Sequence, residues 1–307
     1  MIAMLIVCVD GGQTKTSIDL FDGNAGLIRN WKTEPVIHYA RPGGLDSYFR
    51  IAAGLCEELN GMKLAEPVSV CFSLSGYHGD VSIIPETIER GMSGRNFSMA
   101  GLLVVPDYWG NWRAVTNGKP GIVVISGGGT VAYGKNAAGS SARLGGWGHH
   151  LGDEGSGYWI GLEAVKEVLK ARSGISASTA LEQPVASMLD FKEESGLLAG
   201  FYSGEITDKD LALLVPAVNE QAERGDPAAC RIMEEAAGHL FRLAFAALKR
   251  LGGELPVYLS GGVFNASTLR RNLSSLFETA GISRLVSICE GNPAHGIYSL
   301  ARENAAL

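Results

Sequence analysis

Cysteine is scarce in this sequence: 307 residues contain only five, and these are widely spaced. A disulfide framework or a zinc site needs cysteines at close, paired spacings, so neither is expected. Most of the five have apolar neighbours, which is typical of reduced, buried thiols in a cytosolic protein. They are Cys8, Cys56, Cys71, Cys230 and Cys289.

The sequence also lacks an excess of basic charge and any long apolar run. Lysine and arginine total 26 against 32 aspartates and glutamates, a net charge of −6. A protein that binds nucleic acid without regard to sequence needs a basic surface, so we expect no nucleic-acid partner. Phosphate ligands are not excluded, because backbone N–H groups can bind them. The apolar residues 1–9 are too few to span a bilayer and lack a basic leader, so we expect a strand there, no membrane partner and a cytoplasmic location.

Apolar composition and a regular alternation of segments are what the sequence does have. Hydrophobic residues make up 46% and charged residues 19%, which favours packed cores, and the length fits about two domains. The polar stretch 117–121 suggests a boundary between domains at 1–118 and 119–307, with the option that the last helix, about 293–304, packs back on the first domain. The segments indicate an α/β protein. Strands are expected at 5–9, 17–21, 26–31, 68–74, 102–105, 122–125, 131–133 and 255–259, and helices at 45–59, 155–171, 208–224, 226–251 and 293–303.

Glycine is enriched, at 41 residues, and glycine pairs follow three of the predicted strands. Asp10-Gly11-Gly12 and Ser126-Gly127-Gly128 occupy equivalent places in the two halves, which suggests a duplicated domain. Ser260-Gly261-Gly262 is the third. Glycine lets backbone N–H groups approach phosphate oxygens, so the three pairs together predict a nucleotide site, whereas a single one could equally be a hairpin turn. Neither the Walker pattern nor the dinucleotide fingerprint is present.

Two segments carry a resemblance to a known family. Residues 10–15, DGGQTK, resemble the first phosphate loop of the actin/hexokinase/Hsp70 superfamily. Residues 145–161, GGWGHHLGDEGSGYWIG, closely resemble the signature of N-acetylglucosamine kinases, in the BadF/BadG/BcrA/BcrD-type ATPase grouping of that superfamily. Other matching segments follow in the family's order along nearly the whole chain. The resemblance implies two ribonuclease-H-like domains around a cleft, and an enzyme that uses ATP and Mg²⁺ to phosphorylate an amino sugar.

The resemblance also implies which residues serve phosphoryl transfer. Asp107 matches the family's catalytic aspartate and would accept the proton of the sugar 6-hydroxyl; by its position alone it could be a helix N-cap. Asp10 would orient Mg²⁺, with an acceptor role in an Asx turn as the alternative, and Lys15 could equally be a solvated strand residue. The expected nucleotide-binding residues are Gly11, Gly12, Thr14, Lys15, Gly127, Gly128, Gly129, Thr130, Gly261 and Gly262.

Sugar binding is implied by the same signature. Trp147 would pack its indole on a pyranose face unless it belongs to the core, and Gly148 leaves backbone groups free to bond the sugar substituents. Asp153 matches an acidic residue that bonds sugar hydroxyls, with a salt-bridged loop as the alternative. His149 and His150 have no third zinc ligand at the usual spacing, so packing or polar roles are favoured. The expected substrate-binding residues are Gly76, Asp107, Gly146, Trp147, Gly148 and Asp153.

This chain departs from the family pattern in two places. Many relatives carry Gly-Thr-Gly-Ser in the second phosphate loop, where residues 127–130 here are Gly-Gly-Gly-Thr, so one hydroxyl is lost and the backbone contacts remain. The family's sugar-binding Asn has no clear match within residues 35–43, where His38 is only a weak substitute. The machinery for phosphoryl transfer is therefore better supported than the identity of the sugar.

We expect N-acetylglucosamine 6-phosphate as the product, and alternatives remain open. The nearest is a kinase for glucosamine, N-acetylmuramic acid or a related sugar. An activator ATPase of the 2-hydroxyacyl-CoA dehydratase type would need thiolates for an iron–sulfur cluster and would leave the segment around Trp147 unexplained. A sugar-sensing regulator is disfavoured by the acidic net charge and by a chain that starts directly in the catalytic domain. A homodimer is implied by the resemblance alone.

Overall fold

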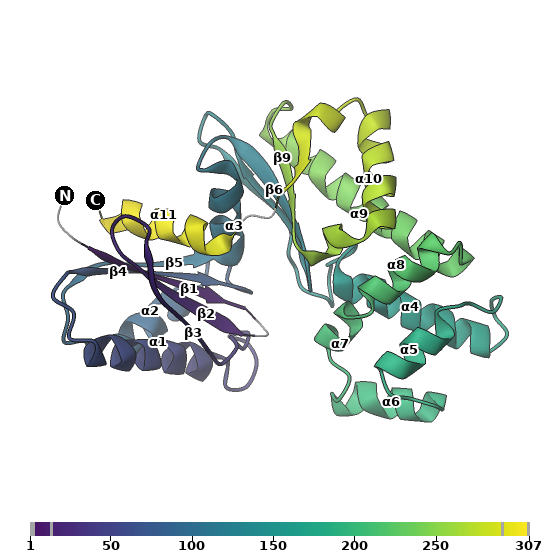
Figure 1. Cartoon of the computed structure of the whole chain (residues 1–307), viewed down its shortest axis with the longest axis horizontal. Helices are drawn as coiled ribbons and strands as arrows, with labels where there is room; N and C mark the ends of the chain where they lie inside the picture. Colours follow the sequence, from purple (N-terminus) through teal and green to yellow (C-terminus); the bar gives the residue numbers. More distant parts are fainter. Residues whose placement is uncertain (1–3, 13–14, 290–291, 306–307) are drawn as a thin grey trace. The chain divides into compact units, whose positions relative to one another are not determined.

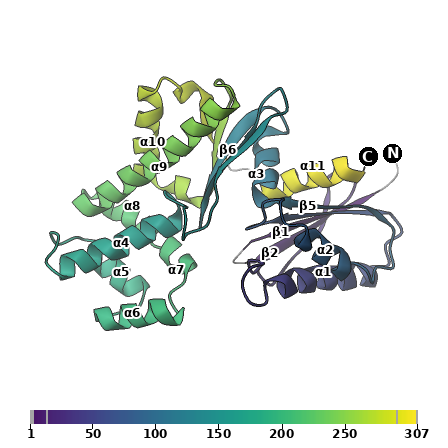
Figure 2. The same ribbon diagram turned by 180° about the vertical axis from the view of Figure 1, so that it is seen from behind.

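The computed structural model describes residues 4–12, 15–289 and 292–305, and the chain forms two compact units in it. The first unit is Met1–Gly118 together with Gly291–Leu307, and the second is Lys119–Glu290. Each unit contains a five-stranded sheet and several helices, which Figures 1 and 2 show from opposite sides. Both sheets mix parallel and antiparallel pairs, so the predicted α/β class is confirmed.

The sheet of the first unit has the strand order β3-β2-β1-β4-β5. β1, β2 and β3 form an antiparallel meander, while β4 and β5 run parallel to β1. Asp22 fixes the turn between β2 and β3, because its carboxylate accepts the N–H groups of Asn24 and Gly26, each at 2.8 Å. The strands are β1 (Leu5–Gly11), β2 (Thr16–Phe21), β3 (Leu27–Thr33), β4 (Val68–Leu74) and β5 (Met99–Pro106).

Helices cover both faces of this first sheet. α1 (Gly44–Gly61) and α2 (Ile83–Gly91) pack on one face, and α3 (Asp107–Thr116) and α11 (Pro293–Ala305) lie on the other. Successive side chains of a strand point to opposite faces, so Val7 joins the core beneath α1 while Ile6 joins the core beneath α11. The hydroxyl of Ser69 donates to the carbonyl of Ala301 at 2.7 Å, which ties the end of the chain to β4.

The sheet of the second unit repeats this connectivity. Its order is β10-β9-β6-β7-β8, with β6, β7 and β8 antiparallel and with β9 and β10 parallel to β6. A meander of three strands followed by two parallel strands therefore occurs in both units, as a duplicated domain would give. The strands are β6 (Gly121–Ser126), β7 (Thr130–Lys135), β8 (Ser141–Gly145), β9 (Val257–Ser260) and β10 (Val286–Ile288).

The core of the second unit lies between its sheet and a group of helices. α9 contributes Met233, Leu240 and Ala244, which recur at helical spacing and are fully buried. It begins after Asp226, whose side chain accepts the N–H of Ala229 at 2.9 Å, and ends at Gly252 in the left-handed conformation. The helices are α4 (Gly157–Arg172), α5 (Glu182–Met188), α6 (Glu194–Ser203), α7 (Asp208–Ala212), α8 (Val215–Glu223), α9 (Pro227–Leu251) and α10 (Ser267–Thr279), with 3₁₀ turns at Gly262–Asn265 and Ser283–Leu285.

The structure differs from the sequence-based expectation in several elements. The single helix predicted at 208–224 is wrong: α7 ends at Ala212, and α8 begins at Val215 with Pro216 in its first turn, where a proline needs no N–H partner. The helices α2, α5, α6 and α10 and the strands β8 and β10 were not predicted. The two strands are short, and the residues of β10 are only partly covered by other atoms, so no buried apolar run marks it.

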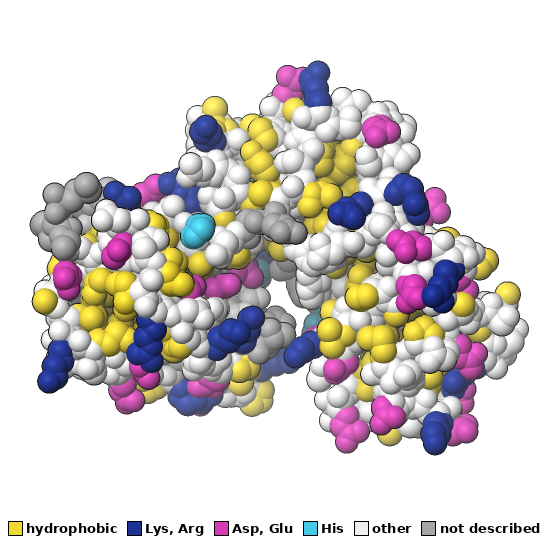
Figure 3. Space-filling model, viewed as in Figure 1, with side chains coloured by type: hydrophobic (Ala, Val, Ile, Leu, Met, Phe, Trp, Pro, Cys, Tyr) yellow, Lys and Arg dark blue, Asp and Glu magenta, His cyan; other side chains and the backbone are white. Residues whose placement is uncertain are grey.

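Charged side chains of both signs are interspersed on the face seen in Figure 3. The described residues on that face form no extended patch of lysine and arginine of the kind that binds a nucleic-acid backbone. None of the helices in the described ranges combines the length and the apolar character needed to cross a membrane.

Candidate functional site

The predicted site residues of the first unit gather where its parallel strands end. In the register of the sheet Asp10 pairs with Ser73, and Leu74 pairs with Pro106. Asp107, the first residue of α3, comes directly after β5. The end of β1, the Ser75-Gly76 turn after β4 and Asp107 therefore lie along one edge of the sheet, the usual place for ligands in α/β folds.

The surroundings of Asp107 raise the pKa of its carboxyl group. Burial raises the pKa of its carboxyl to about 6, and the nearby carboxylate of Asp10 also raises it. Hydrogen bonds from the Ser75 hydroxyl and from the N–H groups of Tyr108 and of Asp107 itself act in the opposite direction. Pro106 is the N-cap of α3, so the N-cap position that was the alternative for Asp107 belongs to its neighbour.

Asp10 is the second carboxylate at this edge. Its pKa is raised by burial and by the carboxylate of Asp19 on the adjacent strand, while the charge of Lys15 lowers it. Crowded negative charge of this kind is relieved by a cation, and carboxylate oxygens are ligands that Mg²⁺ prefers. The described residues contain no cluster of three or more histidine, cysteine or acidic ligands, but Mg²⁺ shared with phosphates needs only one or two carboxylates.

The first glycine loop is held tightly against its surroundings. A Cβ on Gly11 would lie 2.7 Å from a methyl group of Leu74 and 2.8 Å from one of Val36, so a larger residue would require these side chains to shift. The N–H of Gly12 donates to the carbonyl of Lys15 at 3.0 Å, and the Lys15 residue is exposed. Thr14, which the resemblance also assigns to the nucleotide, lies outside the described residues.

Gly76 and His38 are neighbours. Gly76 adopts a φ of 75°, and a Cβ at this position would lie 3.0 Å from the His38 ring. The ring of His38 stacks on Tyr39 with centroids 4.6 Å apart, and burial lowers the pKa of the imidazole. Burial therefore favours the neutral ring, which can accept or donate a hydrogen bond beside Gly76.

In the second unit, the second glycine loop connects β6 to β7. The N–H of Gly127 donates to the carbonyl of Gly129 at 3.0 Å, which closes the turn. The N–H groups of Gly128 and Gly129 donate no hydrogen bond within the described ranges, and both residues are exposed. Two such groups on one turn form the type of backbone anion site that the sequence predicts.

The run that follows β8 is shaped by residues with positive φ. Gly145, Gly146 and Gly148 have φ values of 69°, 69° and 78°, which only glycine adopts readily. These turns leave Trp147 57% exposed, so the alternative of a core tryptophan is wrong. The guanidinium of Arg143 lies over the indole, 4.1 Å from the ring centroid.

Asp153 is the residue that joins this run to the second glycine loop. Its carboxylate accepts the N–H of Thr130 at 3.1 Å, and a Cβ on Gly129 would lie 2.9 Å from its Oδ2. Burial raises the pKa of Asp153, and the Thr130 bond lowers it. Asp153 forms no salt bridge within the described ranges; it is His149 that pairs with Asp208, at 3.0 Å.

The third glycine pair packs directly on the second loop. Gly261 has a φ of 115°, and a Cβ on it would lie 2.2 Å from the carbonyl oxygen of Ser126. Around a Cβ on Gly262, in contrast, there is open space. The hydroxyl of Ser126 donates to the Gly155 carbonyl at 2.9 Å, so the two loops and the 145–157 run form one cluster at the strand ends of this unit.

Sequence reasoning missed two residues of these clusters. Ser75 had no motif, and only the pairing of β4 with β5 places its hydroxyl at Asp107. Arg143 lies on the short strand β8, which was not predicted. A hydroxyl residue before the turn glycine Gly76 was the available signal for Ser75.

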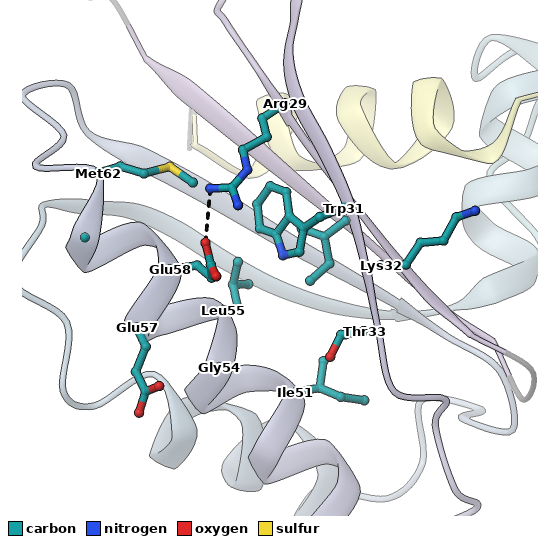
Figure 4. A pocket seen from close by; sticks show the side chains of 12 residues that line it. Arg29, Trp31, Lys32, Thr33, Ile51, Gly54, Leu55, Glu57, Glu58 and Met62 are labelled. Carbon is teal, nitrogen blue, oxygen red and sulfur yellow. Dashed lines mark ion pairs between the residues drawn. The ribbon is translucent and has the colours of Figure 1, made fainter.

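A pocket of about 640 Å³ lies elsewhere, between β2, β3 and α1 of the first unit (Figure 4). Arg29 pairs with Glu58 at 3.0 Å across its mouth, and its guanidinium lies 4.9 Å from the centroid of Trp31. None of the predicted site residues lines it. The pocket is therefore separate from both strand-end clusters.

The chain is similar to known proteins along most of its length. The model of the BadF/BadG/BcrA/BcrD ATPase family matches residues 7–291. An N-acetylmuramic acid/N-acetylglucosamine kinase of Clostridium acetobutylicum is 36% identical over 211 residues, 67% of each chain. An N-acetyl-D-glucosamine kinase of Dictyostelium discoideum is 30% identical over 281 residues, 84% of this chain and 85% of its own.

The fold also matches solved structures. A crystal structure from Chromobacterium violaceum, provisionally named an N-acetylglucosamine kinase, superposes with a TM-score of 0.72 at 24% identity, over 97% of this chain and 98% of the other. At this identity the match shows the fold alone, and it agrees with the two-domain architecture expected from the sequence.

Proposed function

Because the chain belongs to the BadF/BadG/BcrA/BcrD ATPase family, we propose that it transfers the γ-phosphoryl group of ATP to an amino sugar, with the 6-hydroxyl of N-acetylglucosamine as acceptor. The observation that carries this proposal is the pair of relatives at 36% and 30% identity, whose names both include N-acetylglucosamine kinase, the first together with N-acetylmuramic acid. Their similarity extends over two thirds or more of this chain.

In this proposal Asp107 is the general base. Phosphoryl transfer requires positioning, neutralisation of charge and an acceptor for the hydroxyl proton. A carboxylate with a pKa of about 6 is deprotonated at neutral pH and is a stronger base than an ordinary aspartate. The hydroxyl of Ser75 and the N–H of Tyr108 bond to the same carboxylate, so they orient it toward the sugar hydroxyl.

The nucleotide is assigned to the glycine loops. In the second unit, the N–H groups of Gly128 and Gly129 suit phosphate oxygens, because neither donates a hydrogen bond within the described ranges. In the first unit, Gly11 and Gly12 are the residues proposed to contact phosphate. Asp10 would hold Mg²⁺, which supplies charge neutralisation on the phosphates when bound. The charge of Lys15 is close enough to Asp10 to lower its pKa, so Lys15 can serve the same phosphates.

The sugar is assigned to Trp147 with its flanking glycines and to Asp153. An exposed indole offers an apolar face to a pyranose ring, and the carboxylate of Asp153 has acceptor capacity beyond its bond to Thr130. In the first unit, Gly76 is the proposed sugar contact, and the neutral imidazole of His38 lies next to it.

The test is the initial rate of ADP formation with Mg²⁺ and one sugar at a time. N-acetylglucosamine, glucosamine, N-acetylmannosamine and glucose are compared with a control that contains no sugar. We expect strong stimulation by N-acetylglucosamine, and a Trp147→Ala variant should lose most of it through a raised sugar KM. Leu151→Ala is the matched control, because Leu151 is also exposed and lies in the same run. ADP formation that is independent of every sugar would contradict the proposal.

A further inference from the structure

Arg143 is fixed in place beside the proposed sugar contacts. It lies at the centre of β8, opposite Tyr133 of β7, while its neighbour Leu144 packs against the core of the second unit. The guanidinium lies 4.1 Å from the centroid of the Trp147 indole. Its Nη1 donates to the carbonyls of Gly145 and Gly146, at 3.1 and 3.2 Å.

The charge of Arg143 has no acidic partner within the described ranges. Three other arginines are half-buried, and each forms an ion pair with a carboxylate: Arg95 with Glu89, Arg113 with Glu303, and Arg172 with Glu182 and Glu194. Arg143 is half-buried as well, but within the described ranges its guanidinium bonds to backbone carbonyls and lies over an indole, with no carboxylate among its partners. A partly desolvated cation is stabilised by an anion, so this position favours a ligand that carries negative charge.

The position of the guanidinium determines which group of a ligand can contact it. A Cβ on Gly146 would lie 3.4 Å from Nη1, so a sugar that contacts the backbone of Gly146 is next to the guanidinium. Both of these hydrogen bonds of Arg143 use Nη1. A guanidinium carries five N–H donors in a planar fork that matches a carboxylate, so other donors remain for a ligand.

We propose that Arg143 binds a carboxylate carried by the sugar, so that the site accepts amino sugars with a carboxyalkyl ether substituent as well as neutral ones. This inference rests on the proposed function. One relative is named as a kinase for both N-acetylmuramic acid, which bears such a group, and N-acetylglucosamine. The structure adds Arg143 as the residue that would bind the negative charge of this group.

The experiment compares three sugars: N-acetylglucosamine, N-acetylmuramic acid, and the methyl ester of N-acetylmuramic acid, which has nearly the same shape without the charge. The wild type is compared with Arg143→Gln and Arg143→Lys. We expect Arg143→Gln to lower kcat/KM for N-acetylmuramic acid by about tenfold to a hundredfold, the size of one lost charge-assisted hydrogen bond. The ester and N-acetylglucosamine should change by less than about threefold, and lysine should restore part of the loss because it keeps the charge without the fork.

Arg172→Gln is the matched control in the same unit. The guanidinium of Arg172 lies 5.1 Å from the centroid of Phe191, and its Nη1 donates to the carbonyl of Lys192 at 3.0 Å. Arg172 shares the aromatic ring and the backbone carbonyl with Arg143, but it is also paired with Glu182 and Glu194 and lies in another part of the unit. This variant should leave the ratio of the two kcat/KM values unchanged.

Three outcomes would overturn the proposal. A wild type that phosphorylates N-acetylglucosamine and the ester but not the acid would show that the charge is rejected. If Arg143→Gln lowers kcat/KM equally for all three sugars, Arg143 acts by positioning the Trp147 indole and not by binding a carboxylate. If the variant raises the KM for ATP, Arg143 contacts a phosphate group. Calorimetric binding of the acid and the ester without ATP tests Arg143 even if no sugar is phosphorylated, which separates this result from a failure of the proposed function.

Discussion

The carboxylate of Asp153 accepts the backbone N–H of Thr130 at 3.1 Å, so a residue proposed for the sugar is bonded to the loop proposed for the phosphates. Two substitutions separate these roles. Asp153→Asn keeps an acceptor for the Thr130 N–H and loses the charge, whereas Asp153→Ala loses both. We expect Asn to raise the sugar KM about tenfold with little change in the KM for ATP, and Ala to raise both. Identical kinetics of the two variants would show that the bond to Thr130 has no part in nucleotide binding.

Asp107→Asn tests the general base. Loss of a positioned proton acceptor lowers kcat by about 10²–10⁴-fold, and sugar binding measured by calorimetry should remain close to that of the wild type. Asp80→Asn, an exposed acidic residue of the same unit, is the control. Full turnover by Asp107→Asn would refute the assignment.

The pH dependence of kcat/KM follows from the environment of Asp107. Burial and Asp10 raise the pKa of this carboxyl to about 6, and a base acts only when deprotonated, so activity should rise with pH through about 6 and level off above it. Ser75→Ala removes a hydrogen bond that lowers this pKa, so the rising limb should move to higher pH.

Ser73→Ala is the matched control for the Ser75 variant. The hydroxyl of Ser73 is buried near the end of β4, two residues before Ser75, and has no hydrogen-bond partner in the part of the chain that the structure describes. Its removal should leave the limb in place. If the rise of kcat/KM stays near pH 6 in Ser75→Ala, Ser75 does not influence the pKa of Asp107.

Substitution of the adjacent glycines Gly261 and Gly262 should have different effects on the free energy of unfolding. Gly261 has a φ of 115° and no room for a Cβ against Ser126, whereas Gly262 has open space around the same position. Gly261→Ala should lower the free energy of unfolding by at least about 1–3 kcal/mol, while Gly262→Ala should change it little. Thermal unfolding of both variants measures the difference, and equal midpoints would contradict the geometry.

Most of the fold could be predicted from the sequence because its strands are short apolar runs bounded by glycine and aspartate. The resemblance supplied the two-domain architecture, which local patterns do not contain, and the strand order came only from the structure. What could not be predicted depends on tertiary packing: β8, with the sequence Ser-Ala-Arg-Leu-Gly, is a strand because β7 pairs with it. The break between α7 and α8 could not be predicted, because Leu211, Leu214 and Val218 recur at the spacing of one helix and all three lie in the core.

The candidate site was predicted residue by residue where a motif exists. Asp10, Asp107 and the glycine pairs lie at strand ends as expected, and their assigned roles remain predictions. Ser75 had only a weak signal, a hydroxyl before Gly76, because its contact with Asp107 depends on strand register. Arg143 had none, because its partners are set by the left-handed turn at Gly145 and Gly146. Single residues without a motif carry no such information in one sequence.

The central claim is that the γ-phosphoryl group of ATP is transferred to an amino sugar, and analysis of the products tests it most directly. The protein is incubated with ATP, Mg²⁺ and N-acetylglucosamine, and ADP, inorganic phosphate and sugar phosphate are quantified together by phosphorus NMR. We expect equal amounts of ADP and a 6-phosphorylated sugar, with little of either product when the sugar is left out. ADP and inorganic phosphate formed at the same rate with and without sugar would contradict it.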